Sequence, residues 1–422
     1  MVAKRLDLTM NFARLGLAAG VGALNAGGKA LSRVGFDAPA LDLESLKLAA
    51  RRRARLDDFG DWPLGEPLTR LLESYRAEAC LTTLGRVTVR ELIISLLETL
   101  LQLEAERART PRLENESIEA PVFIVGLPRT GTTLLHGLLS ADPANRVPRT
   151  WEVMYPAGFP NDSDGIARAH RQTAARLAWA NRLAPQFRKI HPIAPDLPQE
   201  CIAITAQVFM SIQFHTTHNV PSYEDWFEND SQQLAYAYHH RFLQHAQARG
   251  PAGRWVLKAP GHLFALDALL DRYDDARIIQ MHRDPLRVMA SMASHASVLR
   301  RAFSDRVDPG QVAADWTARW AGALEKFLSI RNRTPVERFF DISYDDIVAA
   351  PLATVERVYE FLGWTLSDEA QRAMGTYLDA NPKNKHGAHR YSLAEYGLDR
   401  DTEIERFRSY CERFDISVKA DS

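Results

Sequence analysis

The sequence predicts an α/β protein in which helices flank a parallel β-sheet. From about residue 121 onward, short apolar segments alternate with segments of helical periodicity, as is typical of βαβ units. Residues 1–115 show helical periodicity alone. We therefore expect an N-terminal all-helical extension over residues 1–115 and an α/β domain over residues 116–422, with a helical insert at about 164–250. The expected strands are Val122–Val125, Trp255–Leu257, Ile278–Met281 and Phe339–Ile342.

The N-terminal extension carries signals for the ends of its helices. Leucines recur at spacings of three and four between residues 92 and 103, which predicts an amphipathic helix. Thr88 and Glu91 have the spacing of a capping box and predict the start of that helix. Thr110 followed by Pro111 predicts its end, because proline cannot continue a helix.

The first residues of the chain combine Lys4 and Arg5 with an apolar stretch from Leu15 to Ala26. A signal peptide has a similar layout, but Asp7 and several glycines interrupt it here. The stretch is also too short to span a bilayer. We expect a helix that packs on the domain, on a neighbouring copy of the chain or on a membrane surface. Peripheral membrane contact and a homo-oligomer are both open on this basis.

The overall charge and the cysteines exclude some classes of protein. The net charge of −1 gives no reason to expect a nucleic-acid partner. Three cysteines without paired spacing do not suit a disulfide framework or a cysteine-ligated zinc site. We expect a cytoplasmic protein with reduced thiols.

The segment after the first expected strand has the layout of a phosphate-binding loop. Gly126-Leu-Pro-Arg-Thr-Gly-Thr-Thr133 lies between that strand and a helical pattern, so the predicted sheet is of the P-loop type. Backbone N–H groups in such a loop, together with the helix N-terminus, hold an anion. Thr132 occupies the position of the lysine that ATP- and GTP-binding loops carry, and Arg129 is the cation of the loop.

The missing lysine weakens the interpretation of the chain as a P-loop phosphotransferase or NTPase. That function also needs an acidic residue at a strand end to hold Mg²⁺. Asp284 follows an expected strand, but it stands between Arg283 and Pro285, which is typical of a helix N-cap. This function is kept as an alternative.

A sulfuryl donor fits the loop better than a nucleoside triphosphate does. A sulfuryl group carries less charge than a terminal phosphoryl group, so fixed cations can stabilise its transfer without a metal. The donor adenosine 3′-phosphate 5′-phosphosulfate (3′-phosphoadenylyl sulfate, PAPS) would place one anion in the loop and its 3′-phosphate in a second basic site. Arg283 at a strand exit and Ser291, eight residues later on the next helix, are candidates for that second site.

Several motifs together resemble the PAPS-dependent sulfotransferase superfamily, in the bacterial branch related to tyrosylprotein sulfotransferases. The loop resembles its 5′-phosphosulfate motif, and Arg283 with Ser291 resembles its 3′-phosphate motif. The segments Lys258-Ala-Pro and Trp151-Glu152 also resemble elements of this branch, as do three segments nearer the C-terminus: Ile342–Asp346, Phe361–Gly363 and His389–Leu398. The resemblance covers residues 120–400 and implies PAPS as donor, adenosine 3′,5′-bisphosphate as product, and no metal.

The resemblance also implies roles for individual residues. Arg129 would contact the sulfonate, and Lys258 would contact the bridging oxygen of the donor and help the leaving group depart. Arg390, in a basic glycine-containing loop, is a further candidate for holding the 3′-phosphate. The loop residues expected to hold the 5′-phosphate are Thr130, Gly131, Thr132 and Thr133.

The acceptor hydroxyl needs a general base. Glu152 is the first candidate, because the related branch has a carboxylate close to this point. His262 is the second candidate, followed by His136 and Glu200.

The acceptor and the activity are less well defined by the sequence. The aromatic helical insert and the apolar N-terminus favour a small or lipid-like hydroxyl compound, such as a sterol or an aromatic alcohol, over a bulky polysaccharide. His215 and His218 have the spacing of a metal pair on one helix face, but no further ligand motif accompanies them. A catalytically silent nucleotide-binding relative is the remaining alternative.

Overall fold

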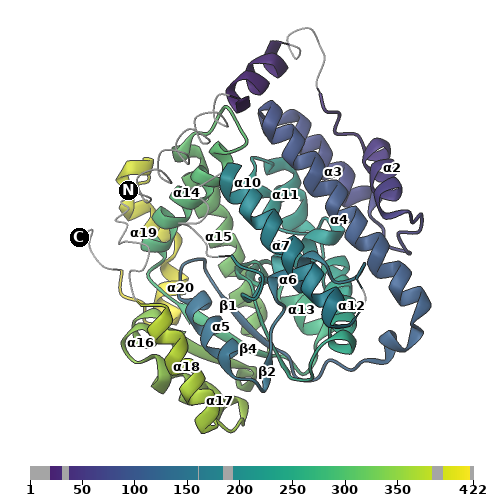
Figure 1. The fold of residues 1–422 in the computed structure, drawn as a ribbon. Coiled ribbons are helices and arrows are strands. Elements are labelled where there is room, and N and C mark those ends of the chain that lie inside the picture. Colours follow the sequence, from purple (N-terminus) through teal and green to yellow (C-terminus); the bar gives the residue numbers. More distant parts are fainter. Residues whose placement is uncertain (1–19, 31–37, 160, 184–192, 383–392, 419–422) are drawn as a thin grey trace, which may run out of the picture.

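The computed structural model describes residues 20–30, 38–159, 161–183, 193–382 and 393–418 (Figure 1). Five parallel strands form one sheet in the order β2-β3-β1-β4-β5. All four expected strands are confirmed, while β2 was missed because two residues are too few to show a pattern. The strands are β1 (Val122–Gly126), β2 (Asn145–Arg146), β3 (Arg254–Lys258), β4 (Arg277–His282) and β5 (Phe339–Ser343).

Side chains alternate between the two faces of the sheet, and helices cover both faces. Val122 and Ile124 belong to a cluster on one face, and Phe123 and Val125 belong to a larger cluster on the other. The smaller cluster includes residues of α5 (Thr132–Ala141), α16 (Tyr344–Ala349), α17 (Pro351–Leu362) and α18 (Asp368–Ala380). The larger includes residues of α12 (Gln233–Arg249), η3 (Pro260–Phe264), α13 (Leu266–Arg272), α14 (Pro285–Arg301) and α15 (Pro309–Arg331).

The N-terminal part of the chain is helical, as expected. Residues 20–30 form a helix, followed by α2 (Leu43–Ala54), α3 (Gly65–Ala77), α4 (Thr83–Arg109) and the short η1 (Pro111–Asn115). Leucines of α3 and α4 lie in the same hydrophobic cluster as Phe123 of the sheet, so this part of the chain shares its core with the α/β part. In Figure 1, α4 runs along one side of the molecule, away from α16–α18. Of the helices in the described ranges, none is both long and apolar enough to cross a bilayer.

The predicted start of the long helix was wrong, whereas its predicted end is confirmed. The helix begins at Thr83 because the Thr82 hydroxyl caps it by accepting a hydrogen bond from Gly85 N–H at 3.0 Å. Thr88 lies inside the helix and donates to the carbonyl of Gly85 instead. The helix ends at Arg109, with Thr110 as its C-cap before Pro111.

Helices also fill the chain between β2 and β3, which contains most of the aromatic residues of the expected insert. Phe209, Phe214, Tyr223 and Tyr238 are fully buried in the larger cluster, so they are core residues. Trp179 is 56% exposed, and Phe187 lies outside the described residues. The elements of this segment before α12 are α6 (Thr150–Met154), α7 (Ser163–Leu183), α9 (Cys201–Thr205), η2 (Ala206–Val208), α10 (Gln213–Thr217) and α11 (Pro221–Asn229).

The C-terminal part returns to the edge of the sheet where the strands end. After η4 (Val336–Arg338), β5 and α16–α18, the described chain continues with η5 (Ala394–Tyr396), α19 (Arg400–Arg406) and α20 (Arg408–Arg413). Tyr410 of α20 contacts His282, the last residue of β4.

A close backbone contact joins the N-terminal helices to the end of α14. Leu81 forms an antiparallel bridge with Ser304, and Thr82 N–H donates to the carbonyl of Phe303 at 2.9 Å. A Cβ at Gly85 would lie only 2.1 Å from the same carbonyl oxygen. Glycine is therefore needed at this position to let the two segments approach.

We expect Gly85→Ala to lower the free energy of unfolding by about 1–3 kcal/mol, because the methyl group would push the Phe303 backbone away. Urea unfolding would measure this. Gly322→Ala is the matched control, since Gly322 lies in α15 and a Cβ there meets nothing within 4 Å. Equal effects of the two substitutions would contradict the steric account.

The core holds several histidines that burial keeps neutral. Burial lowers the pKa of five of them to about 3 or 4 (His136, His215, His218, His245 and His262). In the unfolded chain these side chains would bind protons near pH 6.5. Between these values the unfolded state binds more protons than the folded state, so stability falls as the pH falls. Burial raises the pKa of Glu224 and Glu228, so these two carboxyl groups make the folded state more stable as the pH falls. They are fewer than the buried histidines.

We expect the free energy of unfolding to be lower at pH 5.5 than at pH 7.5, with each buried histidine contributing up to about 1.4 kcal/mol. Urea unfolding at the two pH values would test this. His218→Gln should reduce the difference, because it removes one of these buried histidines. A stability that does not change with pH would show that the carboxyl groups cancel the histidines.

Candidate functional site

The parallel sheet brings four strand ends to one edge. Gly126 ends β1 opposite Met281, Lys258 ends β3 opposite Ile124, and His282 ends β4 opposite Ser343. The phosphate-binding loop and the segments that begin at Ala259, Arg283 and Tyr344 therefore all leave the sheet at its carboxyl edge. Open α/β sheets bind their ligands at this edge.

The loop between β1 and α5 has a backbone that few sequences can adopt. Gly126 has a φ of +146°, and a Cβ there would lie 2.6 Å from the carbonyl oxygen of Met281. Gly131, the N-cap of α5, has a φ of 91°. Arg129 has a φ of 67°, which is unusual for a residue with a side chain. The loop therefore stores backbone strain beside the N-terminus of α5, as is common at ligand sites.

The four loop residues expected to hold the 5′-phosphate have different environments. The Thr130 hydroxyl points inward and donates to the Leu127 carbonyl at 2.7 Å, so a ligand contact from this residue would come from its backbone N–H. Thr132 is buried and Thr133 is exposed in the first turn of α5. The N–H groups of this turn point out of the helix end, where an anion is stabilised.

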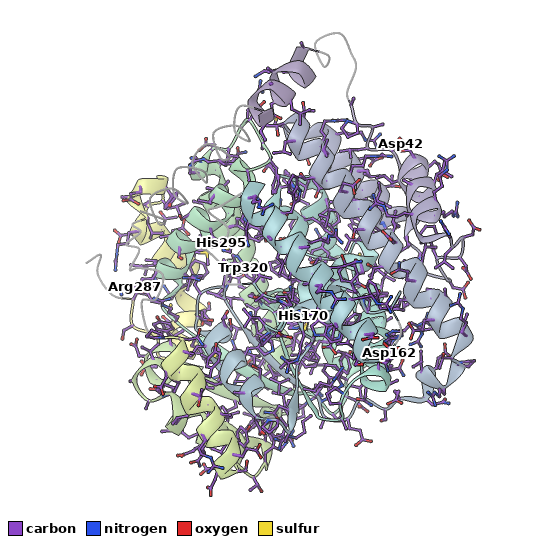
Figure 2. The ribbon with its side chains drawn as sticks, in the orientation of Figure 1. Asp42, Asp162, His170, Arg287, His295 and Trp320 are labelled. Atoms are coloured by element: carbon purple, nitrogen blue, oxygen red, sulfur yellow. The ribbon has the colours of Figure 1, made fainter. Side chains whose placement is uncertain are left out.

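Three arginines gather at the mouth of this loop. The Arg283 guanidinium donates to the Arg129 carbonyl at 2.6 Å and lies 3.8 Å from the centre of the Tyr344 ring. Burial lowers the pKa of Arg283; the Tyr344 hydroxyl and Asp284 counter this, and the positive charges of Arg129 and Arg287 lower it further. Figure 2 shows Arg287 at the periphery of the molecule, unlike the buried Trp320. A group of cations with so little compensating charge favours an anionic ligand.

The helix after Arg283 starts as expected. Asp284 caps α14 by accepting a hydrogen bond from Leu286 N–H at 3.0 Å, and Pro285 is the first residue of the helix. Ser291 is half-buried two turns along the same helix. Arg390, the other candidate for the 3′-phosphate, lies outside the described residues.

A second group of titratable side chains surrounds the end of β3. Lys258 is 1% exposed, and its ammonium forms an ion pair with the carboxylate of Glu200. Glu200 is the N-cap of α9, so the helix dipole stabilises its negative charge. His136 donates to the Val256 carbonyl at 3.3 Å, and burial, then the charge of Lys258, lowers its pKa to about 3. Lys258 and Glu200 thus form a buried ion pair at the carboxyl edge.

His262 lies beside this ion pair but is held as a neutral core residue. Its Nδ1 atom is 2.7 Å from the Tyr236 hydroxyl, while its Nε2 atom is buried and has no hydrogen-bond partner among the described residues. Burial lowers the pKa of His262 to about 3. A side chain with so low a pKa is a weak acceptor for a proton at neutral pH.

Glu152, the first candidate for the general base, has different surroundings from Lys258. One carboxylate oxygen accepts from Arg146 at 2.9 Å, and the other accepts from Arg149 N–H at 2.9 Å, which caps α6. The Arg146 guanidinium also donates to the carbonyls of Ala246 and Pro251, just before β3 begins. Lys258 is at the far end of that strand, four residues after Arg254, and this part of the strand is roughly 13 Å long at 3.3 Å per residue. Each oxygen of the Glu152 carboxylate thus accepts one hydrogen bond near the start of β3, and the role of Glu152 as general base stays a prediction.

The two histidines with metal-like spacing face different partners. The Nε2 atom of His215 is 2.6 Å from Asp315, whereas the Nδ1 atom of His218 is 3.1 Å from the Tyr75 hydroxyl. In the described part of the chain, no group of three or more His, Cys, Asp or Glu side chains is arranged to hold a metal ion.

The structure adds residues to the site that the sequence did not single out. Arg287 is one turn after Arg283, and its Nε atom is 3.8 Å from Asp284. Tyr344 belonged to a resembling segment but was given no role, although its ring stacks on Arg283. Glu200 was the last of the four general-base candidates, because no sequence signal links it to Lys258, 58 residues away.

Comparison with known proteins agrees with this geometry. The family model described as "Sulfotransferase family" matches residues 121–368, more than half of the chain. A curated relative, omega-hydroxy-beta-dihydromenaquinone-9 sulfotransferase Stf3 of Mycobacterium bovis, is 26% identical over 265 residues. This match covers 58% of the present chain and 63% of the relative, so the chain spans less than two thirds of that protein.

Two crystal structures share the fold. Sulfotransferase STF1 from Mycobacterium tuberculosis is 35% identical, with a TM-score of 0.78 over 87% of this chain and 98% of that one. Sulfotransferase STF9 from Mycobacterium avium is 25% identical, with a TM-score of 0.80 over 91% of this chain and 100% of that one. With the phosphate-binding loop, Lys258 and Arg283 meeting at one edge of the sheet, these matches show that the chain belongs to the sulfotransferase family.

Proposed function

We propose that this protein transfers a sulfuryl group from PAPS to a hydroxyl group of a small, lipid-like acceptor. The observation that carries the proposal is the meeting of Arg129, Arg283 and Arg287 at the phosphate-binding loop. These arginines come from two segments more than 150 residues apart, and they supply positive charge at two points around one anion site.

The two anionic ends of PAPS suit the two parts of this site. The 5′-phosphosulfate would lie against the N-terminus of α5, with the exposed Arg129 side chain beside the sulfonate. The 3′-phosphate would bind the outward donors of Arg283, together with Ser291 and Arg287. A guanidinium suits this task because it forms two parallel hydrogen bonds to a phosphate. Arg390 stays a prediction for the same group.

Lys258 and Glu200 would carry out the transfer itself. When the donor binds, the Lys258 ammonium would turn from Glu200 to the bridging oxygen between sulfur and the 5′-phosphate. The acceptor oxygen forms a bond to sulfur as the bond from sulfur to the bridging oxygen breaks, and the acceptor proton passes to the Glu200 carboxylate. Lys258 then offsets the charge that remains on the leaving phosphate. No metal is needed in this scheme, because fixed cations neutralise the transferred group.

The proposed acceptor class rests on the relatives and on the apolar surroundings of the site. The name of the curated relative Stf3 describes a hydroxylated menaquinone as its substrate. In the present chain, Ile202 and Ile212 lie next to Gly261, three residues after Lys258. Apolar side chains at this distance from the transfer site favour an acceptor with an apolar body.

The N-terminal helix is a candidate for membrane contact. Most residues of the helix over 20–30 are exposed, and Leu24 is 45% exposed. A peripheral contact would let the enzyme take a lipid-like acceptor from a bilayer surface. This role, a homo-oligomer and a cytoplasmic location stay predictions.

We expect adenosine 3′,5′-bisphosphate to raise the thermal unfolding midpoint more than 5′-AMP or Mg-ATP. A ligand at 100 times its Kd stabilises the folded state by about 2.7 kcal/mol. Arg283→Ala should remove most of the difference between the bisphosphate and 5′-AMP, because 5′-AMP lacks the 3′-phosphate. A larger shift with Mg-ATP would favour the phosphotransferase or NTPase function.

Turnover separates the proposed enzyme from a silent nucleotide-binding relative. We expect radiolabelled sulfate to pass from PAPS to an amphiphilic alcohol, and we expect Lys258→Ala to lower kcat by about 10²–10³-fold. Binding of the bisphosphate without any transfer to a panel of alcohols, sterols and quinols would favour the silent relative.

Glu200→Gln should lower kcat by about 10²–10⁴-fold, because the amide cannot accept the acceptor proton, while the Kd for adenosine 3′,5′-bisphosphate changes little. Glu152→Gln is the matched control. We expect it to lower the unfolding midpoint, because it weakens the bond to buried Arg146, but to leave the folded enzyme active. The opposite pattern would restore Glu152 as the general base, and loss of activity in neither variant would point to His262 or His136.

A further inference from the structure

A chain of hydrogen bonds runs from β5 to the backbone beside the second phosphate site. Arg331 donates to both oxygens of Asp341, at 2.7 and 2.6 Å. The Nε2 atom of His282 lies 2.8 Å from Asp341, and its Nδ1 atom lies 3.1 Å from the Tyr410 hydroxyl of α20. Phe414, just after α20, packs against the His282 ring at 4.1 Å between centres. His282 is the residue before Arg283, so this chain ends next to the phosphate-binding guanidinium.

The charges of these groups fix the direction of each hydrogen bond. Burial alone would raise the pKa of Asp341, but bonds from His282 and Arg331 outweigh it and hold the pKa well below its usual range. An ionised Asp341 only accepts, so His282 donates through Nε2. Burial lowers the pKa of His282 below its usual value, which favours the neutral ring. The free lone pair of Nδ1 then accepts from the Tyr410 O–H.

The Tyr410 hydroxyl also lies near the backbone of Arg283. Burial raises the pKa of the Tyr410 phenol, and an interaction with the backbone N–H of Arg283 acts in the opposite direction. The hydroxyl therefore donates to His282 and lies near the backbone N–H of the next residue. Tyr410 is only 3% exposed, so water does not compete for these contacts.

The main chain and the side chain of Arg283 are thus held by different elements. Tyr410 of α20 holds the side chain of His282, the residue before Arg283. Tyr344 and the Arg129 carbonyl hold the guanidinium from the side of β5 and the phosphate-binding loop. A cation held at both ends loses little conformational freedom when it binds a phosphate.

We propose that Tyr410 is a positioning residue for the 3′-phosphate of the donor, acting through His282 and the backbone of Arg283. The proposal rests on the proposed function, because it takes Arg283 as a ligand of that phosphate. Tyr410 does not touch the nucleotide. It makes the C-terminal helix a support of the nucleotide site, in the way that second partners of metal ligands support a metal site.

Tyr410→Phe tests this with the least change in shape. We expect the Kd for adenosine 3′,5′-bisphosphate, measured by calorimetry, to rise about five-fold or more, which corresponds to about 1 kcal/mol for one hydrogen bond. The Kd for 5′-AMP should stay the same, because it lacks the 3′-phosphate. In turnover assays the KM for PAPS should rise more than kcat falls. Asp341→Asn, which removes the negative charge that His282 and Arg331 bond to, should change the ratio of the two Kd values in the same direction.

Tyr359→Phe is the matched control. Tyr359 is also a buried tyrosine with a hydrogen-bonded hydroxyl, at 2.6 Å from Asp142, but it belongs to the smaller cluster of the opposite face. It should lower stability without changing the ratio of the two Kd values. The positioning role would be overturned if Tyr359→Phe changed the ratio of the two Kd values as much as Tyr410→Phe does. It would also be overturned if Tyr410→Phe left that ratio unchanged.

The failure of the proposed function would look different. If the wild-type protein binds the bisphosphate and 5′-AMP equally well, Arg283 does not bind a 3′-phosphate, and the proposed function and the role of Tyr410 both fall. If the wild type prefers the bisphosphate and Tyr410→Phe keeps that preference, only the role of Tyr410 falls.

Discussion

The site depends on the parallel register between β1 and its two neighbours. Pairing of Ile124 with Lys258 and of Gly126 with Met281 places the ends of three strands within three residues of one another along the sheet. Residues 126, 258 and 283 are far apart in the sequence, yet this register alone brings their segments to one edge. A slip by one residue would turn Lys258 to the other face of the sheet, because side chains alternate along a strand. Backbone hydrogen bonds between the strands thus bring the charged side chains of the site to one edge of the sheet, and the loops set their final positions.

The positively charged side chains at that edge have two different environments. The arginines around the phosphate-binding loop have little negative charge near them, which suits the reversible binding of an anion. Lys258 is instead paired with Glu200 and almost fully buried. A buried ammonium without a partner would cost several kcal/mol, so the Glu200 carboxylate offsets the positive charge of Lys258. In the proposed scheme, a bound donor replaces this carboxylate, which then becomes available beside the acceptor. In the proposed scheme one residue thereby serves the resting state and the transfer.

Much of this arrangement follows from the sequence, and the exceptions have physical reasons. The four longer strands and the phosphate-binding loop are local patterns of apolar and turn residues, so they could be predicted. The start of α4 could not, because the spacing of Thr88 and Glu91 competes with Thr82, and the contact with Phe303 favours the earlier start. The bond between Glu152 and Arg146 could not be predicted, because Arg146 lies in a strand of only two residues. The pairing of Lys258 with Glu200 joins the end of β3 to the N-cap of α9, and no local pattern encodes it.

The junction between Thr82 and Phe303 has a consequence for how the chain acquires its structure. The two residues are 221 positions apart, and the helices before the sheet share its hydrophobic core. At a synthesis rate of about 5–20 residues per second, the partner of Thr82 leaves the ribosome roughly 10–40 s after it. During that interval the junction cannot form, although α4 already has α2 beside it. Contacts of such high sequence separation make folding slow, so the N-terminal helices complete their packing only after most of the chain has been synthesised.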